Sequence, residues 1–151
     1  MRKKITVIPS TYSKSGQLGD FEWMLNQSAY NRTLFIFNDN EEQFDAFVNG
    51  QSSGFSRGGG NAVIRPFRKL TPPRAAGVPT GKSGRGYSAL DQQTKSKIDQ
   101  SIAVITDLLE TNNYDSMIFS ESAEEPGLLG QSIFEVHESV RKYIFDVLKS
   151  R

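Results

Sequence analysis

Residues 33–40 read Thr-Leu-Phe-Ile-Phe-Asn-Asp-Asn, an apolar run that ends abruptly in a polar turn. Because the run is unbroken rather than alternating, it predicts a strand that is buried on both faces of a sheet. Asn38 and Asp39 then lie at the carboxyl end of this strand. Asn40, with Gln43 three residues later, resembles a capping box and predicts a short helix that continues through Val48.

Three further segments have the composition of strands, namely residues 4–9, 61–67 and 116–120. Helices are predicted over residues 20–29, 40–48, 88–110 and 132–149, where capping residues precede apolar side chains at helical spacing. This alternation predicts an α/β fold, a three-layer α/β/α sandwich around a mostly parallel or mixed central sheet. A chain of 151 residues suits one domain, residues 1–151.

The composition excludes several classes of chemistry. The chain has no cysteine, which rules out disulfides, thiolate metal sites and cysteine nucleophiles. With a single histidine, His137, and no nucleophile elbow, hydrolysis would depend on a carboxylate that activates water. We expect no cofactor and no metal site. No apolar run is long enough to span a membrane, so we expect a soluble, cytoplasmic protein with no membrane contact.

Glycine and positive charge are concentrated in residues 50–87. This region holds nine of the 13 glycines, and the window 46–90 contains seven basic residues and no acidic one. Since the whole chain carries +1, the window carries +7 and the remainder −6. Glycine lets backbone N–H groups approach an anion and arginine adds a bidentate fork, so the region predicts phosphate recognition. The alternative is a solvated, flexible loop.

Residues 76–83, Ala-Gly-Val-Pro-Thr-Gly-Lys-Ser, fit the permissive pattern of a P-loop. A P-loop requires a strand before the glycines and a helix directly after the lysine. Pro72 and Pro73 argue against a preceding central strand, and Gly84 and Gly86 argue against a helix after the lysine. We therefore do not expect a nucleoside triphosphatase, although the backbone of this loop remains a candidate phosphate contact.

The order of these motifs resembles that of a macro domain, the fold that binds ADP-ribose. The matching segments are Gly19-Asp20-Phe21, the strand ending in Asn38-Asp39-Asn40, Gly58-Gly59-Gly60, Gly77-Val78-Pro79-Thr80-Gly81 with Gly86-Tyr87, and Phe119-Ser120 with Gly127 and Gly130. They come one after another in the family's order over about residues 18–148. The resemblance implies a macro-like domain that binds ADP-ribose or a related nucleotide in glycine-rich loops at strand carboxyl ends.

The resemblance also implies roles for individual residues. Asp20 would contact adenine; Gly58, Gly59, Gly60 and Asn61 would contact the distal ribose; Thr80 and Gly81, with Gly127 and Gly130, would hold phosphates. Further binding candidates are Asn38 and Ser120 at strand ends, Tyr87 for stacking on a base, and Arg57, Arg65 and Arg85 for charge. We expect the loops 58–61 and 77–87 to close over one nucleotide from opposite sides of the predicted strand 61–67.

Two functions remain open at this level. In one, Asp39 or Glu121 activates water and the protein hydrolyses an ADP-ribosyl or phosphate bond. In the other, the protein is a non-catalytic module that sequesters a nucleotide signal, or contacts RNA or an acidic partner through its basic loops.

Overall fold

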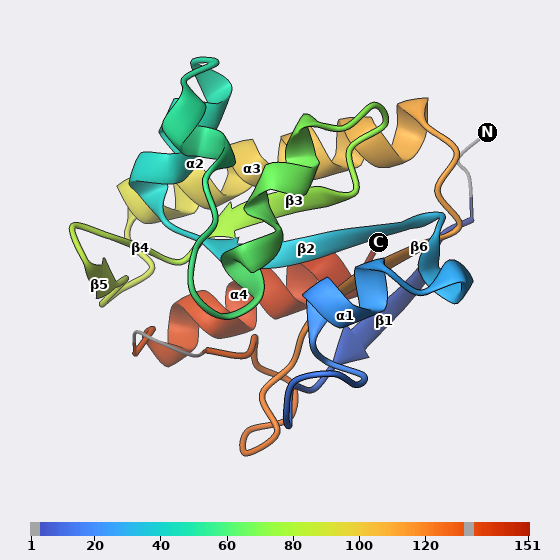
Figure 1. The fold of residues 1–151 in the computed structure, drawn as a ribbon. Coiled ribbons are helices and arrows are strands. Elements are labelled where there is room, and N and C mark those ends of the chain that lie inside the picture. The colour runs from blue at the N-terminus through green and yellow to red at the C-terminus, as the bar shows by residue number, and fades with distance from the viewer. Residues whose placement is uncertain (1–3, 132–134) are drawn as a thin grey trace.

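The computed structural model describes residues 4–131 and 135–151 and has a mixed α/β fold around a four-stranded sheet (Figure 1). The strands lie in the order β1 (Thr6–Ser10), β6 (Ser116–Ser120), β2 (Thr33–Asp39) and β3 (Ala75–Pro79). Each neighbouring pair is parallel. The apolar run at residues 33–37 forms most of the interior strand β2, and residues 34–37 are buried as its unbroken pattern predicts.

Helices and short turns of 3-10 helix connect the strands. The α-helices are α1 (Phe21–Leu25), α2 (Glu41–Val48), α3 (Gln92–Thr111) and α4 (Glu138–Lys149). The 3-10 helices are η1 (Ser28–Tyr30), η2 (Ser52–Phe55) and η3 (Gly60–Lys69), and a small hairpin consists of β4 (Gly81–Lys82) and β5 (Arg85–Gly86). In the described part of the chain, no helix is long and apolar enough to cross a membrane.

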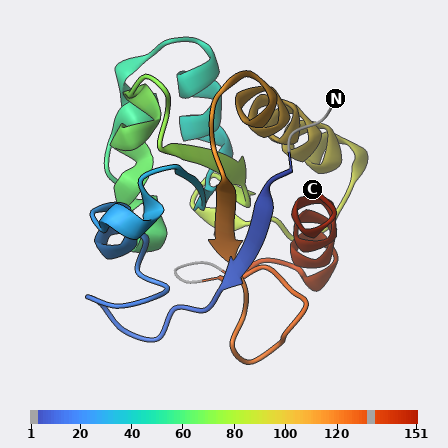
Figure 2. The same ribbon diagram turned by 90° about the vertical axis from the view of Figure 1, so that its right-hand side faces the viewer.

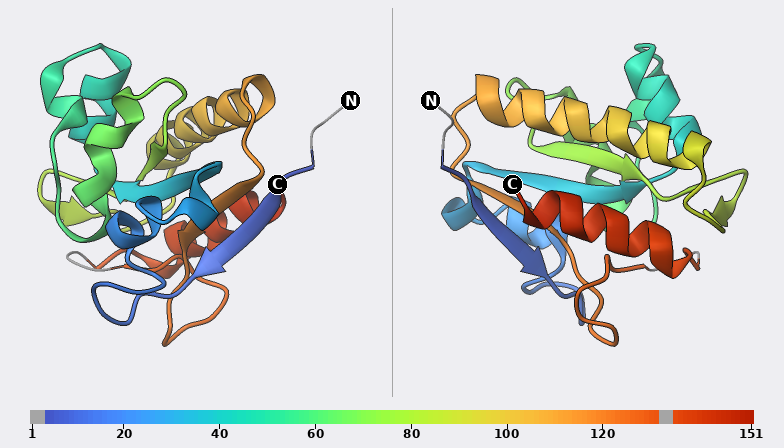
Figure 3. Two further views of the ribbon diagram at one scale, coloured as in Figure 1. Left: turned by 45° about the vertical axis from the view of Figure 1, so that its right-hand side comes forward. Right: turned by 180° about the vertical axis from the view of Figure 1, so that it is seen from behind.

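The two faces of the sheet carry different helices. Figure 2 looks along the sheet, with α3 and α4 on one side and α1 and η3 on the other. On the first side, Ile98 and Ile105 of α3 and Ile144 of α4 are fully buried against the sheet. These two helices lie across the sheet in the rear view of Figure 3.

On the second side the core is aromatic. Phe35 and Phe37 of β2 pack with Phe21 of α1 and Ile64 of η3, and the rings of Phe21 and Phe35 lie 5.4 Å apart. Apolar burial is the main driving force for packing such layers. Because successive side chains of a strand point to opposite faces, β2 contributes Leu34 and Ile36 to the first side.

All four strands are parallel, so their carboxyl ends meet at one edge of the sheet. The loops after β2, β3 and β6 are tied together there. The backbone N–H and hydroxyl of Thr80 donate to the Asp39 carbonyl, at 2.9 and 3.1 Å. The side-chain amide of Asn38 donates to the Gly130 carbonyl at 2.6 Å. This edge is where a ligand would be expected in a sheet of this kind.

Several local predictions are confirmed. Asp20 and Asn40 cap α1 and α2 through their side chains, and α2 ends at Val48 as predicted. The third helix, α3, begins at Gln92 after the N-cap Asp91, which is later than the predicted start at residue 88. The first helix is shorter than predicted, since α1 ends at Leu25 and a 3-10 turn comes after it.

Two predicted elements are wrong. Residues 61–67 form part of the 3-10 helix η3 instead of a strand, and its buried residues Ala62, Arg65 and Arg68 recur at the three-residue spacing of such a helix. The third strand is β3, where a proline-flanked segment was expected to be irregular. The last helix begins at Glu138, after the N-cap residue His137; the predicted start at residues 132–134 lies outside the described residues.

Candidate functional site

A cavity of about 160 Å³ opens at the carboxyl ends of β2 and β3. Five segments contribute to its wall: the end of β2, the first turn of α2, the start of η3, the β4–β5 hairpin and the segment before α4. The predicted site residues on the wall are the catalytic candidate Asp39 and the binding candidates Asn38, Gly59, Arg65, Thr80, Gly81 and Arg85. Residues of the loops 58–61 and 77–87 line the same cavity, and η3 rather than a strand lies between the two loops.

The innermost group of the site is a carboxylate shared by two arginines. Arg65 donates to Asp39 Oδ1 through Nε at 3.1 Å and Nη2 at 2.9 Å, and Arg68 donates to Oδ2 through Nη1 at 2.9 Å. The exposed fractions of the three side chains are 0% for Asp39, 5% for Arg65 and 1% for Arg68. The backbone N–H of Asn40 also donates to Oδ1, at 2.9 Å. Both oxygens of Asp39 thus accept hydrogen bonds, three at Oδ1 and one at Oδ2.

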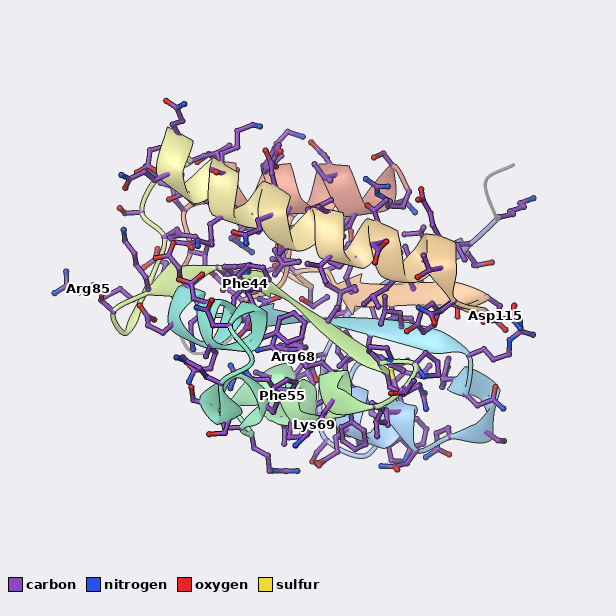
Figure 4. The ribbon with its side chains drawn as sticks, turned by 90° about the horizontal axis from the view of Figure 1, so that it is seen from above. Phe44, Phe55, Arg68, Lys69, Arg85 and Asp115 are labelled. Atoms are coloured by element: carbon purple, nitrogen blue, oxygen red, sulfur yellow. The ribbon has the colours of Figure 1, made fainter. Side chains whose placement is uncertain are left out.

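The rest of each guanidinium is held by carbonyl groups and aromatic rings. Arg68 donates to the carbonyls of Gly54 and Gln43, and its guanidinium carbon lies 4.4 Å from the centre of the Phe47 ring. Arg68 lies under α2, in the interior of the molecule (Figure 4). Burial lowers the pKa of the Arg68 guanidinium, while Asp39 acts in the opposite direction. These contacts fix both arginines with little freedom to move.

Gly77 of β3 makes room for this arrangement. A Cβ atom built at Gly77 would lie 2.7 Å from Asp39 Oδ2 and 2.9 Å from the Phe37 ring. Gly58 is placed similarly, because its Cβ would lie 2.8 Å from Arg65 Nη1. The absence of a side chain lets the backbone approach the charged groups closely at both positions, and a side chain at either one would force its neighbours to shift.

The Asp39 cluster has an excess of positive charge. Two guanidinium groups share one carboxylate, and Arg65 lines the cavity while Arg68 lies behind it. Among the described residues, three of the five N–H groups of Arg65 have acceptors, since Nε and Nη2 donate to Asp39 and Nη1 donates to the Ser56 carbonyl. The wall of the cavity therefore carries positive charge that the described residues do not neutralise.

The β4–β5 hairpin adds two more cations. Lys82 and Arg85 line the cavity and form no ion pair with any other described residue. Figure 4 shows Arg85 extending away from the body of the protein at this end of the sheet. The hairpin is anchored to α2, because Ser83 N–H donates to Glu42 and the Tyr87 hydroxyl donates to Glu41. Burial, and to a lesser degree the charge of Glu41, raises the pKa of Tyr87.

The hairpin also bears on the P-loop pattern. A strand, β3, does precede Gly81-Lys82-Ser83, but it lies at the edge of the sheet and is not the central strand against which Pro72 and Pro73 argued. The lysine leads into the turn of a hairpin and not into a helix, as Gly84 and Gly86 predicted. A P-loop remains excluded for that reason.

The third loop, residues 121–131, folds mainly on itself. The second predicted catalytic carboxylate, Glu121, accepts a hydrogen bond from Gly127 N–H at 3.0 Å and is not on the cavity wall. Ser120 contacts Asn38 and Gly130 through hydrogen bonds. The buried Arg141 of α4 fastens this loop by donating to the Leu129 carbonyl at 2.8 Å.

Other predicted ligand residues have partners within the protein. Asp20 accepts hydrogen bonds from the N–H groups of Gly16 and Trp23. Asn61 accepts from Phe21 N–H and donates to the Gly19 carbonyl, which joins η3 to α1. Arg57 pairs with Glu22 at the surface, Gly60 has a positive φ of 57° at the start of η3, and Tyr87 is buried. None of these predicted residues lines the cavity.

Seven lining residues were not among the predicted site residues: Asn40, Glu42, Ala62, Lys82, Gly84, Gln131 and Val136. Lys82 belongs to the basic window, so the charge pattern was a usable signal for it. Glu42 lies in the first turn of α2, directly after the polar turn at residues 38–40, and that position was a usable signal. No local pattern marks Gln131.

No family model matches the chain, and neither a curated protein nor a solved structure is a significant match to it. The comparisons therefore do not identify a macro domain. In the described residues there is also no group of three or more side chains suited to holding a metal ion.

Proposed function

We propose that the protein binds ADP-ribose or a related nucleotide, with a phosphate group in the cavity at the carboxyl ends of β2 and β3. The observation that carries this proposal is the shared carboxylate of Asp39, which leaves one of two buried guanidinium charges without a counter-ion. An anionic group beside Arg65 would supply that counter-ion through a charge-assisted hydrogen bond.

The positive charges of the β4–β5 hairpin also favour an anionic ligand. Counting Arg68 behind the wall, four cations face two carboxylates, Asp39 and Glu42. Gly59, Gly81 and Gly84 line the space as well, and glycine lets a backbone approach an anion closely.

The size of the cavity suggests how such a ligand would be held. Pockets that enclose small ligands have volumes of roughly 300–1,000 Å³, so about 160 Å³ suits one part of a nucleotide. The phosphate end would be enclosed and the base would lie on the rim. A macro-like three-layer arrangement of helices and sheet belongs to the same proposal.

Binding without hydrolysis is the function that this geometry favours. Asp39 already accepts hydrogen bonds from Arg65, Arg68 and Asn40, and Glu121 accepts one from Gly127. The side chain of Asp39 is fully buried and paired with two arginines, which disfavours its protonation, and Glu121 is not on the cavity wall. Contact with RNA is less favoured, because the buried Arg65 and Arg68 are not available to an extended polyanion.

Calorimetric titration with ADP-ribose tests the proposal, with adenosine as the matched ligand that lacks phosphate. We expect binding of ADP-ribose and a much weaker response to adenosine. The affinity should fall only modestly between low and physiological salt, whereas a polyanion held by many Lys and Arg contacts would lose affinity steeply. The absence of any heat of binding with millimolar ADP-ribose would refute the proposal.

A further inference from the structure

Ser83, at the tip of the β4–β5 hairpin, combines an unusual backbone conformation with an unusual partner. It is the one non-glycine residue with positive φ among the described residues, at 54°, and the next residue, Gly84, has a φ of 76°. Two such residues form the tight turn preferred in two-residue hairpins, but serine tolerates this region less well than glycine. The Ser83 N–H points to a carboxylate, Glu42 Oε2, at 3.1 Å.

Glu42 lies where an anion is stabilised from several sides. It occupies the first turn of α2, whose N-cap is Asn40, and a negative charge at that end of a helix is favourable. It also lines the cavity together with Lys82, Arg85 and Arg65. Of the nearby carboxylates, Asp39 is paired with arginine and Glu41 accepts from the Tyr87 hydroxyl. Glu42 is thus the carboxylate of the cavity wall that accepts a hydrogen bond from the hairpin, while Asp91, the N-cap of α3, also interacts electrostatically with Lys82.

We propose that the carboxylate of Glu42 occupies the position of a ligand phosphate in the free protein, and that a phosphate replaces it at the N–H of Ser83. This inference rests on the proposed function and names Glu42 as a residue that determines specificity. A phosphate can take over the hydrogen bond and the negative charge together. A neutral sugar or nucleoside would leave the Lys82 and Arg85 charges without that anion, so the exchange selects ligands that carry phosphate.

If a phosphate replaces the Glu42 carboxylate in this way, Glu42 should weaken phosphate binding. Its carboxylate competes for the Ser83 N–H, and its negative charge repels the phosphate. Glu42→Gln keeps the size of the side chain and removes the charge. Inorganic pyrophosphate is a suitable probe because it presents the phosphate chemistry without base or ribose. We expect this variant to bind pyrophosphate about tenfold more tightly than the unmodified protein, a modest effect because Glu42 is exposed to solvent.

The matched control is Glu110→Gln, which removes the same charge from an exposed position near the C-terminal end of α3. Pyrophosphate is titrated into the ¹⁵N-labelled unmodified protein, Glu42→Gln and Glu110→Gln, and binding is followed by NMR through the backbone amide resonance of Ser83. The expected result is a shift of that resonance on binding and tighter binding only in Glu42→Gln. Equal affinities of the two variants, or a Ser83 resonance that does not move while others do, would overturn this inference and leave the proposed function standing. Failure of all three proteins to bind either pyrophosphate or ADP-ribose would overturn both.

Discussion

Replacing Asp39 by asparagine removes the negative charge that two buried guanidinium groups share. The exposed fractions of these side chains, 5% for Arg65 and 1% for Arg68, leave little access for water to solvate the unpaired cations. Breaking a buried ion pair by removing one partner costs about 3–5 kcal/mol. With a urea m-value of about 2 kcal/mol/M, the midpoint of unfolding should fall by about 1.5–2.5 M.

Urea unfolding monitored by circular dichroism measures this change. Asp115→Asn is the matched control, because Asp115 is an exposed residue at the opposite edge of the sheet (Figure 4), and its replacement should alter stability by less than about 0.5 kcal/mol. Arg65→Met provides a second comparison. It leaves one arginine for one carboxylate, so we expect a smaller loss of about 1–2 kcal/mol from the missing hydrogen bonds. The reasoning fails if Asp39→Asn costs less than about 1 kcal/mol, or if Arg65→Met costs more than Asp39→Asn.

Three further predictions concern other parts of the fold. Gly77→Ala should lower the free energy of unfolding by about 1–3 kcal/mol, because its Cβ would collide with Asp39; unchanged thermal unfolding would contradict this. Arg141→Met should increase hydrogen exchange in the loop that includes Leu129, and unchanged exchange there would show that Arg141 does not fasten it. Burial raises the pKa of the Tyr114 phenol to about 12. The folded state then holds this proton more tightly than the unfolded chain, so the resulting stability is full below about pH 10 and is lost as pH rises towards 12. The loss of thermal stability over this range should be shallower in Tyr114→Phe, and parallel curves would contradict it.

The sequence predicts the elements whose signals are local. The unbroken apolar run of β2 and the capping pair Asn40 and Gln43 each specify structure within a few residues, and both predictions are confirmed. Asp91 caps α3 in the same way, through a bond to Thr94 N–H. The place of the cavity also derives from a simple rule, because parallel strands bring their carboxyl ends to one edge.

The third strand was misplaced because its determinants are not local. Residues 61–67 have strand-like composition, yet they form η3, where Arg65 and Arg68 reach the carboxylate of Asp39. The true strand, β3, reads Ala-Ala-Gly-Val-Pro, which has weak strand propensity. It pairs with β2 through backbone bonds, and Gly77 fits beside Asp39 because it has no side chain. In both η3 and β3, contacts with other parts of the fold determine the structure against the strand propensity of the local sequence.

The charge pattern points to the region of the cavity but overstates the positive charge that is available there. Of the seven basic residues in the window 46–90, Arg65 and Arg68 pair with Asp39, Arg57 pairs with Glu22, and Arg74 donates to the Thr33 and Tyr30 carbonyls. Their partners lie outside the window, which is why a count within it shows no acidic residue. A count of charges therefore cannot separate cations that build the fold from those, such as Lys82 and Arg85, that face the cavity.

The central claim is that the unneutralised charge of Arg65 holds an anionic group of the ligand. Calorimetric titration of ADP-ribose into Arg65→Met and into the unmodified protein tests this claim most directly. The matched control is Arg57→Met, which also removes one positive charge but from an exposed position at the surface. Arg65→Lys keeps the positive charge, so it separates the effect of losing the charge from the effect of altering the fold. Circular dichroism confirms the fold of each variant. The account predicts at least a tenfold loss of affinity in Arg65→Met, a smaller loss in Arg65→Lys and little change in Arg57→Met. Equal affinities of folded Arg65→Met and the unmodified protein would contradict it.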